Sequence, residues 1–524
     1  MKVLITDPIT DGGKSLPSNA GIEIIDLTDE NSKILEKYLP QIDGWIIRSG
    51  TKITENHIQQ ARNLKVIGRA GVGIDNIDIN SVTLHGIVVM NTPDANTISA
   101  AEHTIAMILS LARNVHMGYD SLRKGLWERN RLIGTELHGK TLGVVGLGKI
   151  GTEVIRRLQY FGLNFIGYDP YVSQEHYEFD FVKIGSLETL CEKSDIITIH
   201  VPKTPSTNGM FDIKMLGTMK DTALIINCAR GGIIVEEDLQ KALENNTIAG
   251  AALDVFETEP PENSPLLKAP NLLFTPHLAA STKEAKEGVS ISICTQVRDY
   301  LIDGKLSNAL NFPIVDPSLL VTLEPFLRMT EILGSIQQQL ADSPAQIISV
   351  TTEGSLKETK LITLAFLKGY LEKIHGSTVN YINAIAVAGS HGMRINETYE
   401  YGESDYANVI STTVSCSNSS LTIKASLFGD VHPRIIYFDG FHLDLKPAGN
   451  LLIIYNKDVP GVVGKVGTHL GNHGINIAEY QLSREPGNHH AISIIRTDSP
   501  LNEGALQELI QINDILSAKQ VVIE

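Results

Sequence analysis

Three side chains that could carry acid–base chemistry stand just after predicted strands in the middle of the chain. They are Arg230, Glu259 and His277, and the apolar runs before them are Ala223–Asn227, Ala249–Leu253 and Leu272–Thr275. A histidine beside a carboxylate is held in one tautomer and becomes a useful proton acceptor near neutral pH. A guanidinium grips a carboxylate with two hydrogen bonds or polarises a carbonyl oxygen. Taken singly, Arg230 fits a surface salt bridge and His277 a structural role, but the three together indicate a catalytic site.

A glycine-rich turn upstream predicts the class of cofactor. The apolar run Thr141–Val145 leads directly into Gly146-x-Gly148-x-x-Gly151. In such a strand–turn–helix, Gly146 permits the tight turn, Gly148 lets the backbone approach a pyrophosphate, and Gly151 lets the helix pack closely on the strand. The free N–H groups at the start of the helix favour the anion. The turn therefore predicts a dinucleotide site.

Asp169 indicates which dinucleotide is bound. It follows a second apolar run, Asn164–Tyr168. This position lies about 20 residues beyond the glycines, where a carboxylate is expected to bind a ribose hydroxyl. The residue favours NAD over NADP.

Short apolar strands alternate with amphipathic helices from the N-terminus to about residue 280, which is typical of parallel α/β sheets. One long apolar helix, Thr97–Met117, is expected to be buried between two units or at a subunit interface. The helix over residues 281–303 is expected to cross back to the first unit. From Leu451 onward the predicted order is βαββαβ, the ferredoxin-like arrangement.

Length, charge and cysteine usage exclude several classes of protein. A chain of 524 residues is too long for one core, and its formal net charge of −16 repels nucleic acid and anionic membranes. The 4 cysteines show no metal-type spacing, so no metal site is predicted and a reduced cytoplasmic compartment is expected. The sequence shows no signal-like segment and no apolar run of membrane-spanning length.

Four motifs in order resemble the D-isomer-specific 2-hydroxyacid dehydrogenase family. The motifs are Gly146–Gly151, Asn227–Gly232, Leu253–Pro260 and Thr275–Thr282. The resemblance implies that His277 takes the hydroxyl proton, that Glu259 pairs with His277, and that Arg230 holds the carboxylate or C2 oxygen of the substrate. The chemistry needs this set, because hydride leaves C2 only as the hydroxyl proton is removed, and positive charge stabilises the substrate anion.

Further arginines bear on the identity of the substrate. Arg48 and Arg69 each stand at a strand end, and Arg129 and Arg131 follow Trp127. One carboxylate needs one cationic anchor, so several arginines indicate a second anion such as phosphate. Solvated or intersubunit salt bridges are the alternative for Arg129 and Arg131. The segments around Arg48, Arg69 and Trp127 resemble the branch of the family that oxidises 3-phospho-D-glycerate to 3-phosphohydroxypyruvate, the first step of L-serine biosynthesis.

The same resemblance implies the other residues around substrate and cofactor. The amides of Gly71 and Val72 are implied to bind the substrate carboxylate, and the arginines Arg48, Arg69 and Arg131 its phosphate. The implied NAD contacts are Gly146, Gly148, Lys149, Ile150, Asp169, His200, Pro202, Thr207, Cys228, Asp254, Ala279 and Thr104. Many relatives carry Gly-Gly where this chain has Ala279–Ala280, and the extra methyl is expected to tighten the nicotinamide pocket.

The C-terminal segment resembles the small amino-acid-binding ACT domain, on residues Asn456–Gly467 and Asn472–Ile477. The resemblance implies L-serine as an effector, with Asn456, Asp458 and Asn476 as regulatory contacts. A carboxylate at Asp458 suits an ammonium group, and Asn476 suits a carboxylate or amide. Caps for the adjoining turn or helix are the alternative for both residues.

The predicted fold class is α/β, with a Rossmann nucleotide-binding domain inserted in a second, flavodoxin-like α/β substrate domain. An α+β intervening domain and the ferredoxin-like βαββαβ ACT domain are expected to follow. The predicted domains are residues 1–97 with 282–313, 98–281, 314–448 and 449–524. We expect a homodimer or homotetramer acting on a small-molecule substrate. The alternatives are a hydroxypyruvate/glyoxylate reductase or other D-2-hydroxyacid dehydrogenase, and a non-catalytic dinucleotide sensor or corepressor.

Overall fold

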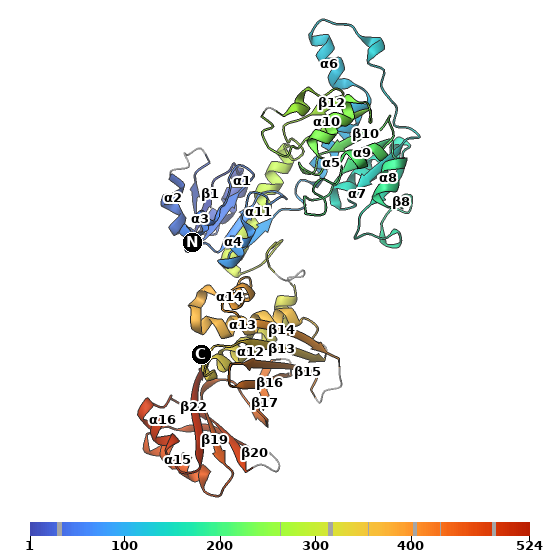
Figure 1. Ribbon diagram of the computed structural model, residues 1–524. Helices are drawn as coiled ribbons and strands as arrows, with labels where there is room; N and C mark the ends of the chain where they lie inside the picture. The colour runs from blue at the N-terminus through green and yellow to red at the C-terminus, as the bar shows by residue number, and fades with distance from the viewer. Residues whose placement is uncertain are drawn as a thin grey trace.

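The structure is a computed structural model that describes residues 1–28, 34–262, 264–312, 318–354, 356–401, 406–429, 431–484 and 489–523. The described residues form four sheets. Figure 1 shows an elongated chain in which the first two sheets lie at one end and the last two at the other. No helix within the described ranges combines the length and the apolar run that a membrane crossing needs.

The first sheet is parallel and has the strand order β2-β1-β3-β4-β5, which is flavodoxin-like. One face is covered by α11, whose Val297 and Ile293 side chains pack so closely on Gly68 that a Cβ there would lie 2.6 Å from a Val297 methyl carbon. The chain thus returns to this sheet after the second one. The strands are β1 Lys2–Ile5, β2 Glu23–Asp26, β3 Gly44–Ile47, β4 Val66–Arg69 and β5 Val88–Asn91, and the helices are α1 Asp11–Asn19, α2 Leu35–Tyr38, α3 Glu55–Gln60, α4 Ile79–Leu84 and α11 Lys283–Asp303.

The second sheet is parallel, with the order β12-β11-β10-β9-β6-β7-β8. The order reverses between β6 and β9, the switch point at which Rossmann-type sheets bind a dinucleotide. Helices α5 and α7 cover one face, and α8, α9 and α10 cover the other. The strands are β6 Thr141–Val145, β7 Asn164–Tyr168, β8 Val182–Ile184, β9 Ile196–Ile199, β10 Leu224–Asn227, β11 Gly250–Leu253 and β12 Leu272–Phe274, and the helices are α5 Thr97–Ala112, α7 Lys149–Leu158, α8 Leu187–Lys193, α9 Ile213–Thr218 and α10 Glu236–Glu244.

The predicted single helix over Thr97–Met117 is wrong, because the structure divides it into α5 and α6, Val115–Arg123. Asn114 between them adopts a left-handed φ of 52°, which asparagine tolerates better than most residues. Its side chain donates to the Ile133 carbonyl at 3.2 Å, so the chain turns away here. Residues 115–134, called the arm below, project from the nucleotide-binding sheet (Figure 1).

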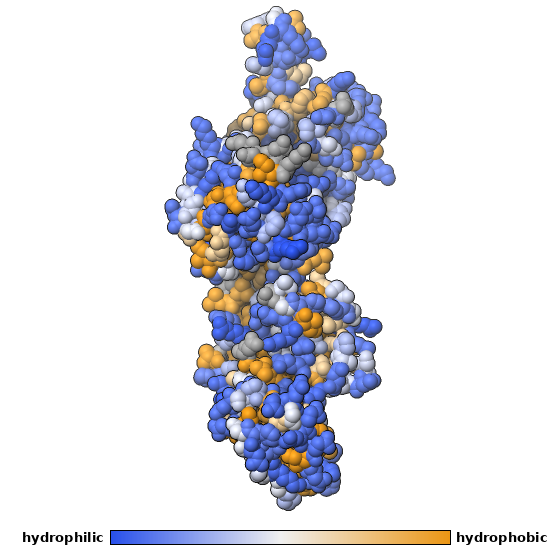
Figure 2. Space-filling view, turned by 90° about the vertical axis from the view of Figure 1, so that its left-hand side faces the viewer, coloured by the Kyte–Doolittle hydropathy of each residue, from blue (hydrophilic) through white to orange (hydrophobic). Residues whose placement is uncertain are grey.

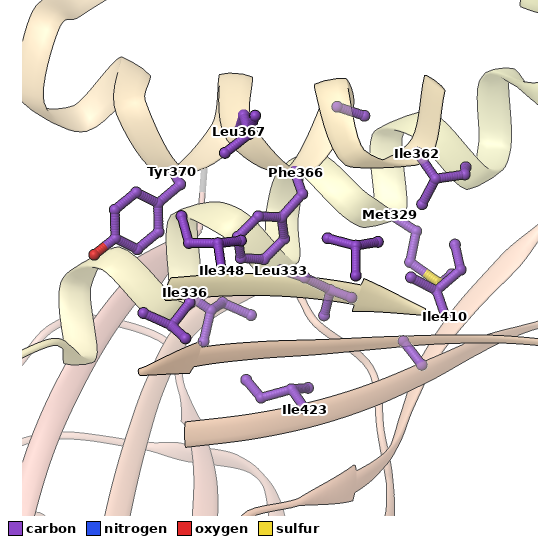
Figure 3. Packing of buried hydrophobic residues seen from close by; sticks show 14 of the residues in the cluster. Met329, Leu333, Ile336, Ile348, Ile362, Phe366, Leu367, Tyr370, Ile410 and Ile423 are labelled. Atoms are coloured by element: carbon purple, nitrogen blue, oxygen red, sulfur yellow. The ribbon is translucent and has the colours of Figure 1, made fainter. Parts of the chain in front are cut away.

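The third sheet is mixed, with the order β14-β13-β15-β16-β17-β18 and only the β13–β14 pair parallel. Helices α12 and α13 pack on it with Leu333, Phe366 and their neighbours in one core (Figure 3). The two helices touch backbone to backbone, since a Cβ on Gly369 would lie 2.0 Å from the Glu331 carbonyl oxygen. The elements are α12 Ser318–Leu340, β13 Ile347–Gly354, α13 Thr359–His375, α14 Ala384–Ser390, β14 Arg394–Glu400, β15 Asn408–Ser415, β16 Ser420–Phe428, β17 His432–Phe438 and β18 Phe441–Leu445.

The fourth sheet is antiparallel, with the order β20-β21-β19-β22, and the elements follow one another as βαββαβ. Both of its helices pack on one face, while Ile453 and Ile494 on the other face join the core of the third sheet. The edge strand β22 is not free, because Gln339 of α12 exchanges two hydrogen bonds of 3.0 Å with the backbone of Val522. The elements are β19 Gly449–Lys457, α15 Val462–Asn472, β20 Ile477–Arg484, β21 His490–Thr497, α16 Glu503–Ile510 and β22 Ile515–Ile523.

Candidate functional site

An arginine–aspartate contact joins the first two sheets at the carboxyl end of β10. Arg230 follows β10 of the second sheet, and its Nε lies 3.4 Å from Oδ2 of Asp75, which belongs to the first unit. A Cβ on Gly73 would lie 2.2 Å from Nη2 of Arg230. Residues from both units therefore build one site.

Three of the predicted arginines lie near one another at this contact. Burial, and then the charges of Arg230 and Arg48, lower the pKa of Arg69 to about 10. The Nε of Arg69 is buried and makes no hydrogen bond to any residue that the structure describes. Three guanidinium groups near one another repel, so an anionic ligand with several oxygens would stabilise the cluster.

The backbone beside Arg69 offers further donors. Gly71 has a φ of 141°, and a Cβ there would lie 1.6 Å from Nη1 of Arg69, so a side chain would displace the guanidinium. Within the described part of the chain, no group accepts a hydrogen bond from the amide of Gly71 or Val72. The Val72 carbonyl is fixed by Asn91, whose Nδ2 donates to it at 2.7 Å. The arrangement suits a carboxylate held by two amides.

Arg131 is the one predicted substrate residue that the chain does not bring to this cluster. It lies on the arm, its side chain is 72% exposed, and its Nη1 is 3.2 Å from Oε1 of Glu128. This is the salt bridge that the sequence left as an alternative. Within one chain, Arg131 therefore has no part in the arginine cluster.

His277 and Glu259 form a close pair. Oε2 of Glu259 lies 2.8 Å from Nδ1 of His277, and Oε1 accepts a hydrogen bond from the Phe256 amide at 3.1 Å. Burial acts to raise the pKa of Glu259, but the hydrogen bonds from His277 and Phe256 outweigh it and lower that pKa. The carboxylate therefore stays ionised beside the imidazole.

The backbone holds His277 in an unusual conformation. Its φ is 53°, which costs energy for a residue with a side chain. The His277 amide donates to the carbonyls of Asp254 at 2.9 Å and Thr275 at 3.0 Å, and these bonds hold the turn. Nε2 of His277 is the ring nitrogen left for a substrate.

Asp254 lies at the centre of a buried hydrogen-bond network, and the sequence predicted only some of its members. Its carboxylate is fully buried and accepts from the Leu278 and Ala279 amides at 2.7 and 2.9 Å, and Oδ1 lies 3.2 Å from Nε2 of His103 on α5. Burial acts to raise the pKa of Asp254, but the hydrogen bonds, that of His103 first, lower it. His103 was not predicted. Its position directly before Thr104 in an apolar helix was the only signal.

The glycine turn has the geometry that its sequence predicted. Gly146 has a φ of 95°, and Cβ atoms on Gly146 and Gly151 would lie 2.7 Å from the His200 carbonyl oxygen and 2.1 Å from the Gly146 carbonyl oxygen. A Cβ on Gly148 would meet nothing within 4 Å, so this side of the turn is open. Gly148 caps the start of α7, where amides are free to bind a diphosphate. These residues fit NAD.

Asp169 lies beside this turn. One carboxylate oxygen accepts from the Leu147 amide at 3.0 Å and the other from the Tyr171 amide at 2.9 Å. Each oxygen keeps a further acceptor site for a ribose hydroxyl. Lys149 forms an ion pair with Asp94 of the first unit, and Ile150 follows it in the first turn of α7.

The remaining predicted cofactor residues line the ends of β9, β10 and α5. Thr207 donates to the Pro202 carbonyl at 2.6 Å, which closes the loop after β9. Burial lowers the pKa of His200 to about 3, so its ring is neutral. Burial, and then the charge of Asp254, raise the pKa of Cys228 to about 12, so the group is a thiol. Thr104 is buried and donates to the Ala100 carbonyl at 2.8 Å.

The predicted regulatory residues fall into two kinds. Asn456 is buried, its Nδ2 donates to the Lys457 carbonyl at 2.8 Å, and its Oδ1 accepts from Ser493 at 3.2 Å, so its side chain faces the interior. Asp458 lies at the end of β19 with Oδ1 3.2 Å from Nε of Arg484. Asn476 donates to Asp498 at 2.7 Å. Asp458 and Asn476 thus make side-chain contacts near the surface rather than helix caps.

Two family descriptions match the chain. Residues 105–279 match the D-isomer specific 2-hydroxyacid dehydrogenase, NAD binding domain. Residues 322–439 match the D-3-phosphoglycerate dehydrogenase intervening domain.

Curated relatives match along nearly the whole chain. The D-3-phosphoglycerate dehydrogenase of Bacillus subtilis is 38% identical over 522 residues, which is 99% of each chain. That of Methanocaldococcus jannaschii is 39% identical over 520 residues, which is 98% of each chain.

Solved structures match part of the chain. An NAD-dependent formate dehydrogenase from Staphylococcus aureus in complex with NAD is 30% identical with a TM-score of 0.54, covering 59% of this chain and 98% of that chain. A glyoxylate reductase from Paecilomyes thermophila is 26% identical with a TM-score of 0.55, covering the same shares of the two chains.

Proposed function

This chain belongs to the D-3-phosphoglycerate dehydrogenase family, and from this premise we propose how its residues oxidise 3-phospho-D-glycerate to 3-phosphohydroxypyruvate. It is an NAD-dependent oxidoreductase, and NAD⁺ when bound supplies the nicotinamide ring that accepts the hydride. Two observations carry the proposal: Arg48, Arg69 and Arg230 lie near one another, and His277 is paired with Glu259.

His277 is the proposed proton acceptor. A carboxylate only accepts hydrogen bonds, so Nδ1 of a neutral His277 carries the proton that faces Glu259, and Nε2 keeps the lone pair. Nε2 takes the hydroxyl proton of the substrate as the C2–H bond breaks. The imidazolium that results is stabilised by the ionised Glu259 at 2.8 Å.

The arginines and the Gly71–Val72 backbone hold the two anionic ends of the substrate. We assign the carboxylate to the amides of Gly71 and Val72, because they lack partners within the described chain. Arg48 and Arg69 are assigned to the phosphate, and Arg230 to the C2 oxygen. Only a phosphorylated substrate uses the whole set, which disfavours glyoxylate and pyruvate.

Asp254 and His103 act as positioning residues in this account. Asp254 fixes the amides of Leu278 and Ala279, which follow the proton acceptor, and its own carbonyl fixes the amide of His277. His103 faces the same carboxylate from α5. Through these contacts, the packing of α5 fixes the position of the loop that carries His277.

A non-catalytic sensor is disfavoured by the geometry of the site. A dinucleotide sensor needs the glycine turn and Asp169 only, whereas here Arg230, Glu259 and His277 are all in position for acid–base work. The test is NADH oxidation with phosphohydroxypyruvate, which a sensor would not support at any protein concentration.

We propose the division of the chain into residues 1–97 with 282–313, 98–281, 314–448 and 449–524. The packing of α11 on β3 and β4 supports the return of the chain to the first unit. The boundary near residue 313 lies outside the described residues. Proteolysis that cut first near residues 313–317 and left two stable fragments would agree with it.

L-serine is the proposed effector of the fourth sheet, through Asp458 and Asn476. The ion pair of Asp458 with Arg484 is exposed enough to exchange partners, since 66% of the Arg484 side chain faces solvent. Asn456, being buried, is left as a structural residue. Initial rates on phosphohydroxypyruvate should fall as L-serine is added, and Asp458→Ala should abolish the response. An unchanged response in that variant would remove Asp458 from the site.

Self-association through the arm is also proposed. The arm exposes a run of large apolar side chains, and Figure 2 shows apolar surface on the projecting tip. The apolar side chains exposed on the arm are those of Val115, Tyr119, Leu122, Leu126, Trp127 and Ile133. Trp127 is 82% exposed and Ile133 is 80% exposed. Such a patch marks an interaction surface, and a homodimer would bury it. In that dimer the predicted contact of Arg131 with substrate is made across the interface.

Light scattering tests whether the arm mediates self-association. The wild-type chain should scatter as a dimer or tetramer, and Trp127→Glu combined with Ile133→Glu should shift it to a smaller species. A wild-type monomer at micromolar concentration would rule the assembly out.

A further inference from the structure

Two histidines and a glutamate meet on the surface of the fourth sheet. His469 lies in the last turn of α15 and His473 is the C-cap of that helix, while Glu508 lies on α16, which packs beside α15 on the same face of the sheet. One ring nitrogen of each histidine and one carboxylate oxygen all lie within 4.8 Å of one another. Figure 1 shows both helices at the opposite end of the molecule from the nucleotide-binding sheet.

Backbone contacts fix the tautomer of His473. Its Nδ1 lies 3.0 Å from the carbonyl oxygen of His469. A carbonyl oxygen only accepts hydrogen bonds, so Nδ1 carries a proton and donates it. The lone pair of the neutral ring is then on Nε2, which lies 3.3 Å from Oε2 of Glu508. A lone pair and a carboxylate at this distance repel unless a cation lies between them, and either a proton on Nε2 or a metal ion can take that place.

The second histidine is oriented in the same manner. Nε2 of His469 lies 2.8 Å from the carbonyl oxygen of Ala505 on α16, so this nitrogen donates and Nδ1 is the acceptor. Metal-binding histidines are commonly held by such a hydrogen bond from the other ring nitrogen, which fixes both tautomer and ring direction. Each neutral ring therefore has one nitrogen bonded to a backbone carbonyl and the other left as an acceptor, which is the arrangement of many metal-binding histidines.

We propose that His469, His473 and Glu508 bind one divalent transition-metal ion of the Zn²⁺ or Ni²⁺ type. Two imidazole nitrogens with one carboxylate oxygen suit these ions, whereas Ca²⁺ and Mg²⁺ prefer oxygen ligands alone. Three protein ligands leave positions for water. Glu508 has a side chain that is 66% exposed, so it is free to move inward to the bond length that a metal requires.

The ion would join α15 to α16. At present these helices are linked at this point by the His469–Ala505 hydrogen bond and the His473–Glu508 contact. α15 begins at Val462, directly after the loop that carries Asp458, so an ion on α15 stiffens the helix next to the proposed serine site. The metal site itself does not depend on serine binding, and its test uses metal alone.

Calorimetric titration of the full chain with ZnCl₂, after treatment with a chelator, tests the proposal. The wild type should bind one ion per chain at this site. His473→Ala should lower the affinity at least about tenfold, because it removes a direct ligand and even outer contacts of a metal are worth that much. Glu508→Gln, which keeps size and shape, should also weaken binding.

His391→Ala is the matched control. His391 and His375 form a second surface pair, with their Nε2 atoms 2.6 Å apart, but without a third ligand from the described residues. This variant should bind Zn²⁺ as the wild type does. Hydrogen exchange in peptides from α15 and α16 should slow with Zn²⁺ in the wild type and in His391→Ala only. Wild-type affinity in both His473→Ala and Glu508→Gln, or loss of binding in His391→Ala instead, would overturn the assignment.

Discussion

Oε2 of Glu259 lies 2.8 Å from Nδ1 of His277, and this contact leaves Nε2 of the histidine for the role of proton acceptor that we propose. The pair comes from two adjacent strands, β11 and β12, whose carboxyl ends meet at one edge of the sheet. The lowered pKa of Glu259 keeps the carboxylate charged, so the imidazolium that we propose for the reaction would have its counterion in place.

Replacing His277 should remove most of the catalysis and leave cofactor binding intact. General acid–base catalysis contributes about 10²–10⁴-fold, so His277→Ala should lower kcat by about that factor. Glu259→Gln keeps a hydrogen-bond acceptor for Nδ1 but loses the charge, so its kcat should fall less. NADH fluorescence titration provides the control, because neither variant should change cofactor affinity. A wild-type kcat in His277→Ala would exclude this histidine as the base.

Replacing Asp169 should change the choice of cofactor. Asp169→Ala removes the carboxylate that we propose binds the ribose hydroxyls and repels a 2′-phosphate. The KM for NAD should rise and the ratio of kcat/KM values for NAD over NADP should fall. Asp169→Asn is the matched variant, since it keeps the size and loses the charge. An unaltered ratio in both would show that Asp169 does not contact the ribose.

His103 should affect the reaction without touching substrate. Hydrogen bonds to charged groups contribute about 1.5–3 kcal/mol, so His103→Ala should cost roughly 10- to 100-fold in kcat/KM. His103→Gln retains a donor toward Asp254 and should recover part of the loss. Steady-state kinetics and NADH titration separate effects on cofactor binding from effects on the substrate. The loss should appear in the affinity for NADH and in kcat, and not in the KM for phosphohydroxypyruvate. Equal effects of the two substitutions would argue against a donor role.

His200 should make the protein sensitive to acid. Burial lowers its pKa to about 3 from an ordinary value of 6.5, so the unfolded chain binds a proton that the folded chain refuses between these values. Stability must therefore fall as the pH drops from about 6.5 toward 3. His200→Gln cannot titrate. Urea unfolding followed by circular dichroism at pH 7.5 and 5.0 should show a smaller acid loss in this variant, and equal losses would contradict the account.

Sequence patterns were sufficient to predict the features that depend on one strand and the turn directly after it. The strand β7 and the turn at Gly146 could be placed because glycine spacing and apolar runs are local signals. The two parallel sheets, the βαββαβ order and the class of cofactor followed from such signals.

Contacts between distant elements could not be predicted. The break at Asn114 depends on a bond to Ile133, and the interior direction of Asn456 depends on Ser493 across the sheet. His103 is distinguished only by Asp254 lying opposite it. The same holds for the proposed metal site, which the sequence did not suggest, because its third ligand comes from another helix.

The arginine cluster is proposed to select a phosphorylated 2-oxo acid. The measurement is kcat/KM for phosphohydroxypyruvate and for glyoxylate, followed by NADH absorbance in the wild type, Arg48→Ala and Arg69→Ala. The wild type should strongly prefer phosphohydroxypyruvate, and each substitution should lower kcat/KM for that substrate far more than for glyoxylate. A higher kcat/KM for glyoxylate in the wild type, or equal losses on both substrates in the variants, would contradict it.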